Sequence, residues 1–65
     1  MTKNEFIELE IENGCKIRFL NLNGELMLGI YLGSDFSNEN FSFRNYSSGN
    51  TEAIYIDNIH SLKIV

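Results

Sequence analysis

Few residues in this 65-residue chain have types that could carry out covalent chemistry. The chain contains one cysteine, Cys15, and one histidine, His60, which together could supply the nucleophile and the base of a thiol-dependent reaction. Cys15, however, falls on the apolar side of an alternating segment, where a small buried cysteine is common, and His60 falls in a corner near the C-terminus. We therefore predict that the protein is not an enzyme, and we expect no cofactor. Because no second cysteine or paired histidine gives a metal-ligand spacing, we also expect no metal site.

Three glutamates near the N-terminus, Glu8, Glu10 and Glu12, occupy every second position and alternate with isoleucine and leucine. On the open face of a strand nothing would raise the pKa of these groups for acid catalysis or enclose a cation. The first 12 residues contain four glutamates and one lysine, so they hold a net charge of −3 out of the −4 of the whole chain. This acidic stretch either favours solubility or docks on a basic or apolar surface of a partner.

Aromatic and basic residues form a third group. Those on predicted outward positions are Tyr31, Tyr46 and Tyr55, together with Arg18, Arg44 and Lys63. Aromatic rings beside cations can anchor a protein partner or stack on nucleic-acid bases. Tyrosine in a small domain also serves as a half-buried cover of the core, so both interpretations stand at this point.

The chain is long enough for one domain only, residues 1–65. A single cysteine cannot make an internal disulfide, which favours a reducing, cytoplasmic setting. The N-terminal residues are charged where a signal peptide would be apolar, and no run of 18 apolar residues occurs. We expect neither secretion by that route nor a membrane-spanning segment. The acidic balance of the chain also disfavours general nucleic-acid binding.

Alternation of apolar and polar residues with a period of two predicts β-strands along the chain. The first predicted strand covers residues 6–12 and is followed by Asn13-Gly14, a dipeptide typical of a type I′ hairpin turn. The second covers residues 15–20 and should run antiparallel to the first. Its inward residues are Cys15, Ile17 and Phe19. Lys16 and Arg18 would then face outward and pair across the hairpin with the glutamates.

The third predicted strand, residues 25–33, contains Gly29, which we interpret as a sharp bend because a long strand of a small barrel must curve. A polar loop over 33–40 leads to a fourth strand. Its inward residues are Phe41, Phe43 and Asn45. After a turn over 47–50 and a strand over 51–56, Asp57-Asn58 interrupts the alternation and predicts a short helical turn or a tight corner before a last strand over 61–65. This order predicts an all-β chain without a long helix, and 65 residues are too few for a sandwich.

From Cys15 onward the order of these signals resembles the Sm-like proteins, whose barrel is a variant of the SH3-like barrel. Gly24, Gly29 and Asp35 keep the spacing of the first Sm motif. The run over 54–62 is similar to the second Sm motif, with Ile59 and Leu62 at its two closing apolar positions. The resemblance covers about three-quarters of the chain and implies a small, strongly bent, five- to six-stranded antiparallel SH3-like barrel. In it, the strand over 7–11 would replace the N-terminal helix of the family.

The resemblance also implies a divergent single-stranded RNA-binding protein that acts as a homo-oligomeric ring. The residues that a ring would place around its pore are Phe36, Asn38, Asn40, Asp57 and Asn58. The Arg-Gly pair with which the family holds RNA is missing, because Asp57-Asn58 follows Ile56 directly. An acidic Sm-like chain without that pair also resembles small bacterial inhibitors of the transcription terminator Rho, which act by binding a protein.

We therefore predict a small non-enzymatic regulatory or adaptor module that binds a protein partner, with RNA binding by a ring as the alternative. The candidate partner-binding residues are Glu8, Glu10, Glu12, Tyr31, Tyr46 and Tyr55. Both hypotheses allow a homo-oligomer, since the apolar last strand could pair within the barrel or with a neighbouring copy. No membrane partner is expected.

Overall fold

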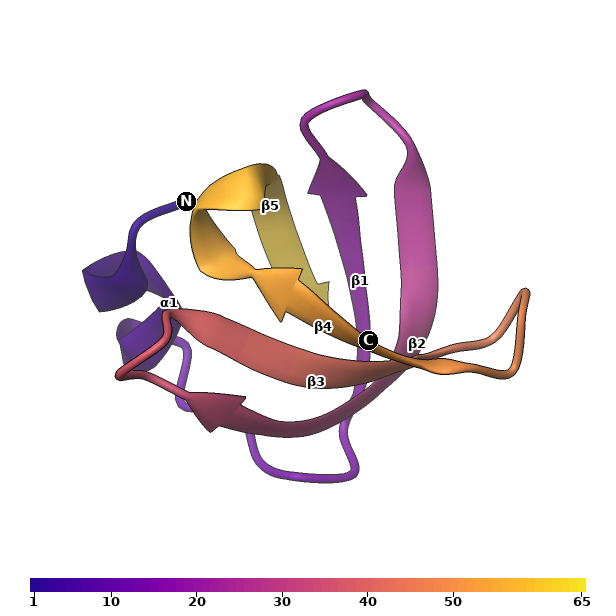
Figure 1. Cartoon of the computed structure of the whole chain (residues 1–65), viewed down its shortest axis with the longest axis horizontal. Coiled ribbons are helices and arrows are strands. Elements are labelled where there is room, and N and C mark those ends of the chain that lie inside the picture. Colours follow the sequence, from indigo (N-terminus) through magenta and orange to yellow (C-terminus); the bar gives the residue numbers. More distant parts are fainter.

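One five-stranded antiparallel sheet and one short helix make up the computed structural model, which describes residues 1–65. The elements are α1 (Lys3–Glu8), β1 (Lys16–Asn21), β2 (Leu26–Asp35), β3 (Asn40–Asn45), β4 (Thr51–Tyr55), the 3₁₀ turn η1 (Ile56–Asn58) and β5 (Ile59–Ile64). The strand order is β4-β3-β2-β1-β5, so β4 and β5 are the terminal strands. Figure 1 shows that β2 and β3 curve strongly along their length. The predicted all-β class is confirmed, and no helix is long and apolar enough to cross a membrane.

A glycine in β2 allows the close approach of β3. Gly29 lies opposite Asn45, and a Cβ at Gly29 would overlap the carbonyl oxygen of Arg44 and lie 2.7 Å from the Phe43 ring. The register of β2 with β3 then shifts between Tyr31 and Ser34, at a site that includes Gly33 with φ +113°. The curvature of β2 therefore involves a bulge beyond Gly29, and not only the bend predicted at Gly29 itself.

The core lies on the inner face of the curved sheet and is largely aromatic. Its buried apolar residues are Phe6, Ile17, Phe19, Tyr31, Phe41, Phe43, Ile56, Ile59 and Leu62. The rings of Phe19 and Phe43 meet edge to face with centroids 5.0 Å apart, a favourable geometry for aromatic pairs. Of the predicted inward residues, Ile17, Phe19, Phe41, Phe43 and Asn45 are buried, whereas Cys15 is only partly buried.

Asn45 is the buried polar residue of the core, and its side chain is fully used. Its Nδ2 donates a hydrogen bond to Glu52 Oε2 at 3.0 Å, and its Oδ1 accepts one from the backbone N–H of Ser47 at 2.8 Å. These bonds tie β3 to β4 and shape the turn between them, which is the turn predicted over 47–50. Burial of the amide is tolerated because both ends of it are paired.

The N-terminal segment is helical, so the strand predicted over residues 6–12 is wrong. Thr2 and Glu5 form a capping box: Thr2 Oγ1 accepts from the N–H of Glu5 at 3.2 Å, and Glu5 Oε1 accepts from the N–H of Thr2 at 2.9 Å. A helix of six residues is marginal alone, and packing of Phe6 against the core stabilises it. No hairpin joins this segment to β1, so Lys16 and Arg18 do not pair across it with the glutamates.

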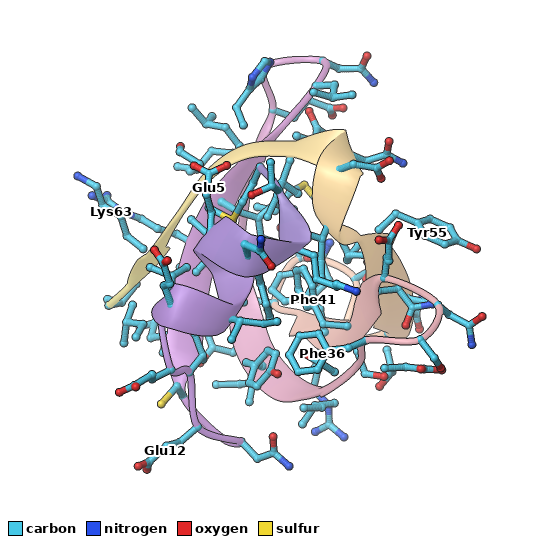
Figure 2. The ribbon with its side chains drawn as sticks, turned by 90° about the vertical axis from the view of Figure 1, so that its left-hand side faces the viewer. Glu5, Glu12, Phe36, Phe41, Tyr55 and Lys63 are labelled. Atoms are coloured by element: carbon cyan, nitrogen blue, oxygen red, sulfur yellow. The ribbon has the colours of Figure 1, made fainter.

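Phe6 carries the contact between α1 and the sheet. Its ring stacks on Phe41 with centroids 5.1 Å apart and lies 6.0 Å from the Tyr31 ring. Figure 2 shows α1 in front of Phe41, and α1 also contacts η1. The helix therefore packs against the core on the inner side of the curved sheet.

The faces of β2 are the reverse of the prediction that placed Tyr31 outside. Tyr31 is only 4% exposed, and its hydroxyl hydrogen-bonds to the Ser34 hydroxyl. On the same strand Leu26 is 63% exposed and Leu28 is 38% exposed. Phe6 and Phe41 surround the tyrosine ring, so the aromatic residue fills the core and the leucines lie outside.

Candidate binding surface

The three predicted acidic residues do not form a flat strand face. Glu8 ends α1, while Glu10 and Glu12 lie in the link between α1 and β1. All three are exposed, and Glu10 has a positive φ of 50°, a conformation uncommon for residues other than glycine. They remain an acidic surface, but one built from a helix end and an irregular link.

The three predicted tyrosines do not form one surface either. Tyr31 is buried, whereas Tyr46 and Tyr55 are exposed. Tyr46 follows β3, and the ammonium group of Lys16 lies 5.5 Å from the centroid of its ring. Tyr55 ends β4 and, in Figure 2, projects from the side of the molecule away from Lys63. Only Tyr46 is therefore linked to the basic residues of the sheet.

The structure places the predicted RNA-contacting residues around the corner between β4 and β5, with Asn58 on its far side, where its carbonyl accepts from the N–H of Leu22 at 3.2 Å. Asn40 lies opposite Tyr55, and the N–H of Ile56 donates to the carbonyl of Glu39 at 3.0 Å, so the turn over 36–39 adjoins η1 with its exposed Asp57 and Asn58.

Two of these side chains are already engaged within the molecule. The Phe36 ring packs edge-on against Phe6 with centroids 6.2 Å apart, and Asn38 Nδ2 donates to Asp35 Oδ2 at 2.7 Å. Hydrogen bonds from the side chains of Ser37 and Asn38 hold the pKa of the Asp35 carboxyl below its usual value. These bonds close the β2–β3 turn.

Cys15 and His60 are not brought together. Cys15 directly precedes β1. His60 lies on β5 between Ser61, the partner of Leu20, and Ile59, the partner of Asn21, and is therefore beside the opposite end of β1. Five residues of extended strand separate these positions by about 16 Å. Cys15 and His60 therefore cannot act as a nucleophile and base. No group of three or more His, Cys, Asp and Glu side chains is placed to hold a metal ion.

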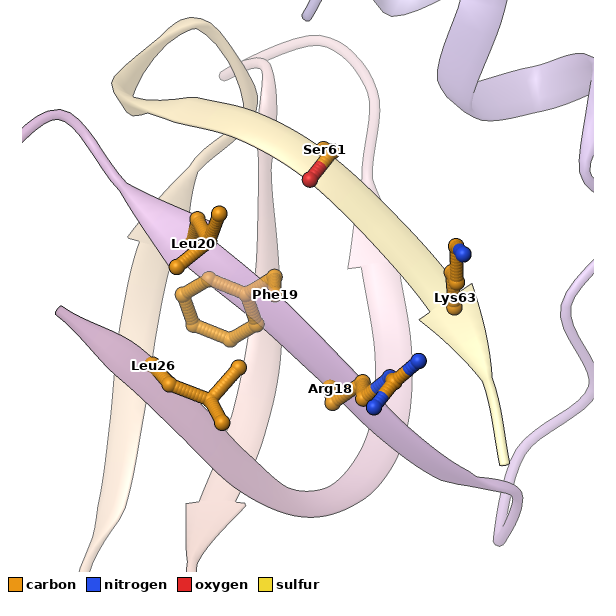
Figure 3. A pocket seen from close by; sticks show the side chains of 6 residues that line it. All are labelled: Arg18, Phe19, Leu20, Leu26, Ser61 and Lys63. Atoms are coloured by element: carbon orange, nitrogen blue, oxygen red, sulfur yellow. The ribbon is translucent and has the colours of Figure 1, made fainter. Parts of the chain in front are cut away.

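A different surface lies on the outer face of the sheet, over β2, β1 and β5. Its residues, which we call the leucine–cation face, are Arg18, Leu20, Leu26, Leu28, Ser61 and Lys63. In the strand register Arg18 lies between Leu28 and Lys63, and Leu20 lies between Leu26 and Ser61. All of these residues except Leu28 line an open pocket of about 290 Å³, shown in Figure 3.

The cations of the chain are concentrated on this side of the sheet. Lys16 lies opposite Ile30, which lies opposite Arg44, and Lys16 shares its strand face with Arg18. Four of the five Lys and Arg residues therefore project from the outer face, although the chain as a whole has a charge of −4. In the strand register none of them has a carboxylate opposite it.

Exposed leucines beside cations give this face two complementary properties. The leucines offer apolar area that is removed from water when a partner binds, and the cations favour a partner with negative charge. Sequence reasoning had placed Arg18, Arg44 and Lys63 outward but had missed the leucines, because it placed Tyr31 on the outer face of β2 and the structure buries that residue. Comparisons of the chain with protein-family models, with curated proteins and with solved structures found no match.

Proposed function

We propose that this chain is a small non-enzymatic regulatory or adaptor module that binds a protein partner through the leucine–cation face. The observation that carries the proposal is the direct pairing of Arg18 with Lys63 beside exposed leucines. Like charges opposite each other on neighbouring strands are destabilising, and large contiguous patches of exposed apolar side chains are uncommon on monomeric proteins. An acidic and apolar partner surface would offset the repulsion between the two cations and remove the leucines from water.

We further propose that the sheet closes into an SH3-like barrel of the Sm-like kind. Three features support this: the strand order with β4 and β5 at the ends, the curved β2 with its bulge, and the 3₁₀ turn between β4 and β5. The helix α1, which packs on the core, adds a fourth, because it corresponds to the N-terminal helix of the Sm-like family, where the sequence pattern had predicted a strand.

The size of the chain is adequate for such a role. A standard interface buries about 800 Å² on each partner, which is roughly a fifth of the 4205 Å² surface of this protein. The outer face of three neighbouring strands can provide that area. The partner expected from its chemistry presents acidic side chains around aliphatic ones.

The proposal is tested by affinity capture with three forms of the full chain. Leu26→Ser removes an exposed leucine of the face, and Leu22→Ser removes another exposed leucine, from the β1–β2 turn, as the matched control. Wild type and Leu22→Ser should retain the same protein at constant stoichiometry, and Leu26→Ser should lose most of it. Capture of nucleic acid without any stoichiometric protein, or equal capture by all three forms, would contradict the proposal.

The second candidate function is RNA binding by a homo-oligomeric ring. It is supported by the proximity of the 36–39 turn to η1, which brings Asn40, Asp57 and Asn58 to the corner between β4 and β5. Oligouridine retention that falls with salt, together with a ring mass in light scattering, would favour it. Loss of retention in an Asn40→Ala, Asn58→Ala double variant would assign the RNA-binding site to the corner between β4 and β5. A monomer that does not retain oligouridine would exclude it.

A further inference from the structure

The chain itself contains a segment with the chemistry that the leucine–cation face is suited to bind. Residues 7–12, which we call the acidic segment, read Ile-Glu-Leu-Glu-Ile-Glu. Ile7 is 45% exposed, and the neighbouring Glu8, Glu10 and Glu12 are all exposed. The acidic segment thus presents an exposed aliphatic side chain among carboxylates, whereas the leucine–cation face presents exposed leucines beside Arg18 and Lys63.

The two surfaces of one molecule are on different sides of its sheet. Phe6, next to the acidic segment, packs on the inner side against Tyr31 and Phe41. Arg18 and Leu20 project from the outer side, because they alternate along β1 with the buried Ile17 and Phe19. Figure 3 shows α1 apart from the pocket. A molecule folded in this way leaves its leucine–cation face free for another molecule.

We propose that the leucine–cation face binds the acidic segment of a second copy of this chain. Carboxylates of Glu8, Glu10 and Glu12 lie against the guanidinium of Arg18 and the ammonium of Lys63, and Ile7 contacts the exposed leucines. This contact joins two different surfaces, so repetition of it gives a ring or an open chain of copies. This proposal rests on the proposed function because it uses the same face. An external acidic partner would compete with the second copy for the leucine–cation face.

The apolar half of the face distinguishes this occupant from a phosphate backbone. Nucleic acid would satisfy the cations but would leave Leu20, Leu26 and Leu28 in water. An aliphatic side chain covers them and gains free energy from the apolar area that both surfaces remove from water.

Sedimentation velocity of the full chain at rising concentration tests the proposal with changes that leave the net charge unaltered. Ile7→Ser alters only the acidic segment, Leu26→Ser alters only the face, and Leu22→Ser is the control outside both. Each of the first two variants should weaken self-association by about tenfold or more, as expected for a central contact, and the control should match wild type. An equimolar mixture of the first two variants retains one intact contact and should form a 1:1 dimer but no larger species.

The charged residues provide an independent pair of variants if either serine variant fails to fold, as judged by its circular dichroism. One is a triple variant of the acidic segment, Glu8→Gln, Glu10→Gln, Glu12→Gln. The other is a double variant of the face, Arg18→Gln, Lys63→Gln. Each of the two variants should abolish the salt dependence of self-association. A wild-type monomer at every concentration, or an oligomer that both classes of variant leave unchanged, would overturn the proposal. Retention of oligouridine that the Arg18→Gln, Lys63→Gln variant loses would overturn it in favour of nucleic acid.

Failure of self-association is distinguishable from failure of the proposed function. If the wild type is a monomer while Leu26→Ser still loses a captured protein, the face binds an external partner and the second copy is excluded. If the wild type self-associates through Ile7 and Leu26 but captures no other protein, the second copy is its occupant and the adaptor role fails.

Discussion

Arg18 on β1 and Lys63 on β5 lie directly opposite each other on the outer face of the sheet, and both are exposed. Residues so placed have their Cβ atoms about 5 Å apart, close enough for like charges to repel. On the other side of Arg18, its partner on β2 is Leu28, so no carboxylate lies opposite Arg18 on either neighbouring strand. The free protein therefore keeps a mildly unfavourable pair at the centre of its proposed binding face.

Reversal of one member of this pair should stabilise the fold. Lys63→Glu replaces repulsion by attraction, so the free energy of unfolding should rise by about 0.5 kcal/mol at low ionic strength, with a smaller gain in high salt. Thermal unfolding followed by circular dichroism measures the change, and Lys3→Glu serves as a charge-matched control away from the face. The same Lys63→Glu protein should bind an acidic partner less well. A lower melting temperature than wild type at low salt would contradict this account.

Gly29 should tolerate no side chain. Gly29→Ala places a methyl group against the backbone of Arg44 and the ring of Phe43, so β2 and β3 must separate, at a cost of at least about 2 kcal/mol. Gly24→Ala is the matched control, because its added Cβ meets nothing within 4 Å and only the positive φ of 81° is unfavourable, by about 1 kcal/mol. Urea unfolding midpoints compare the two. Equal losses would show that close approach is not the reason for glycine at position 29.

The helix α1 should depend on its core contact more than on its cap. Phe6→Ala removes the ring that stacks on Phe41 and should lower the free energy of unfolding by about 3–5 kcal/mol, a large part of the total for a chain of this size. Thr2→Ala removes the capping box and should cost about 1 kcal/mol, while Thr2→Ser keeps it. Chemical denaturation measures all three. If Thr2→Ala costs as much as Phe6→Ala, the cap and not the packing holds the helix.

The pKa values of two exposed carboxyls should report the local structure. Hydrogen bonds from the backbone and hydroxyl of Thr2 lower the pKa of Glu5, and bonds from Ser37 and Asn38 lower the pKa of Asp35. Because both values are lower in the folded state than in the unfolded state, their stabilising effect is present at neutral pH. It is lost as the pH falls below the ordinary values of 4.5 and 3.8 toward the lowered ones.

Carboxyl chemical shifts recorded by NMR against pH test this directly. Thr2→Ala should return the pKa of Glu5 toward 4.5 and leave that of Asp35 unchanged, while Ser37→Ala should do the opposite. Each variant is thus the control for the other. Movement of both values in either variant would indicate a general change in the fold and not the loss of one local bond.

The strands that alternate cleanly were predictable from the sequence. In β1 the apolar residues Ile17 and Phe19 share one face, and in β3 Phe41 and Phe43 do so. Polar residues occupy most positions of the other face of each strand, so only one face can be buried. A helical turn or tight corner was also predictable because Asp57-Asn58 breaks the alternation, and the structure has the 3₁₀ turn η1 at this point. In each of these segments the local pattern and the tertiary packing favour the same structure.

The N-terminal segment and the face of β2 were not predictable from alternation alone. Residues 7–12 alternate perfectly, yet the capping box and the burial of Phe6 favour a helix over the first part of the segment. In β2 both sets of positions are apolar, and a choice between them turns every side chain to the opposite face. The leucine–cation face depends on that choice and on the pairing of residues from the two ends of the chain.

The order of the strands also determines how the leucine–cation face forms during folding. β1 to β4 follow one another as local hairpins, and only the pairing of β1 with β5 joins distant parts of the chain, from Ile17 to Ile64. Loop-closure entropy makes such a pairing slow to form, so the last step of folding should be the docking of β5. Arg18 acquires Lys63 as its neighbour only at that step. The leucine–cation face is therefore completed at the end of folding, and any local opening of β5 disrupts it before the rest of the sheet is disturbed.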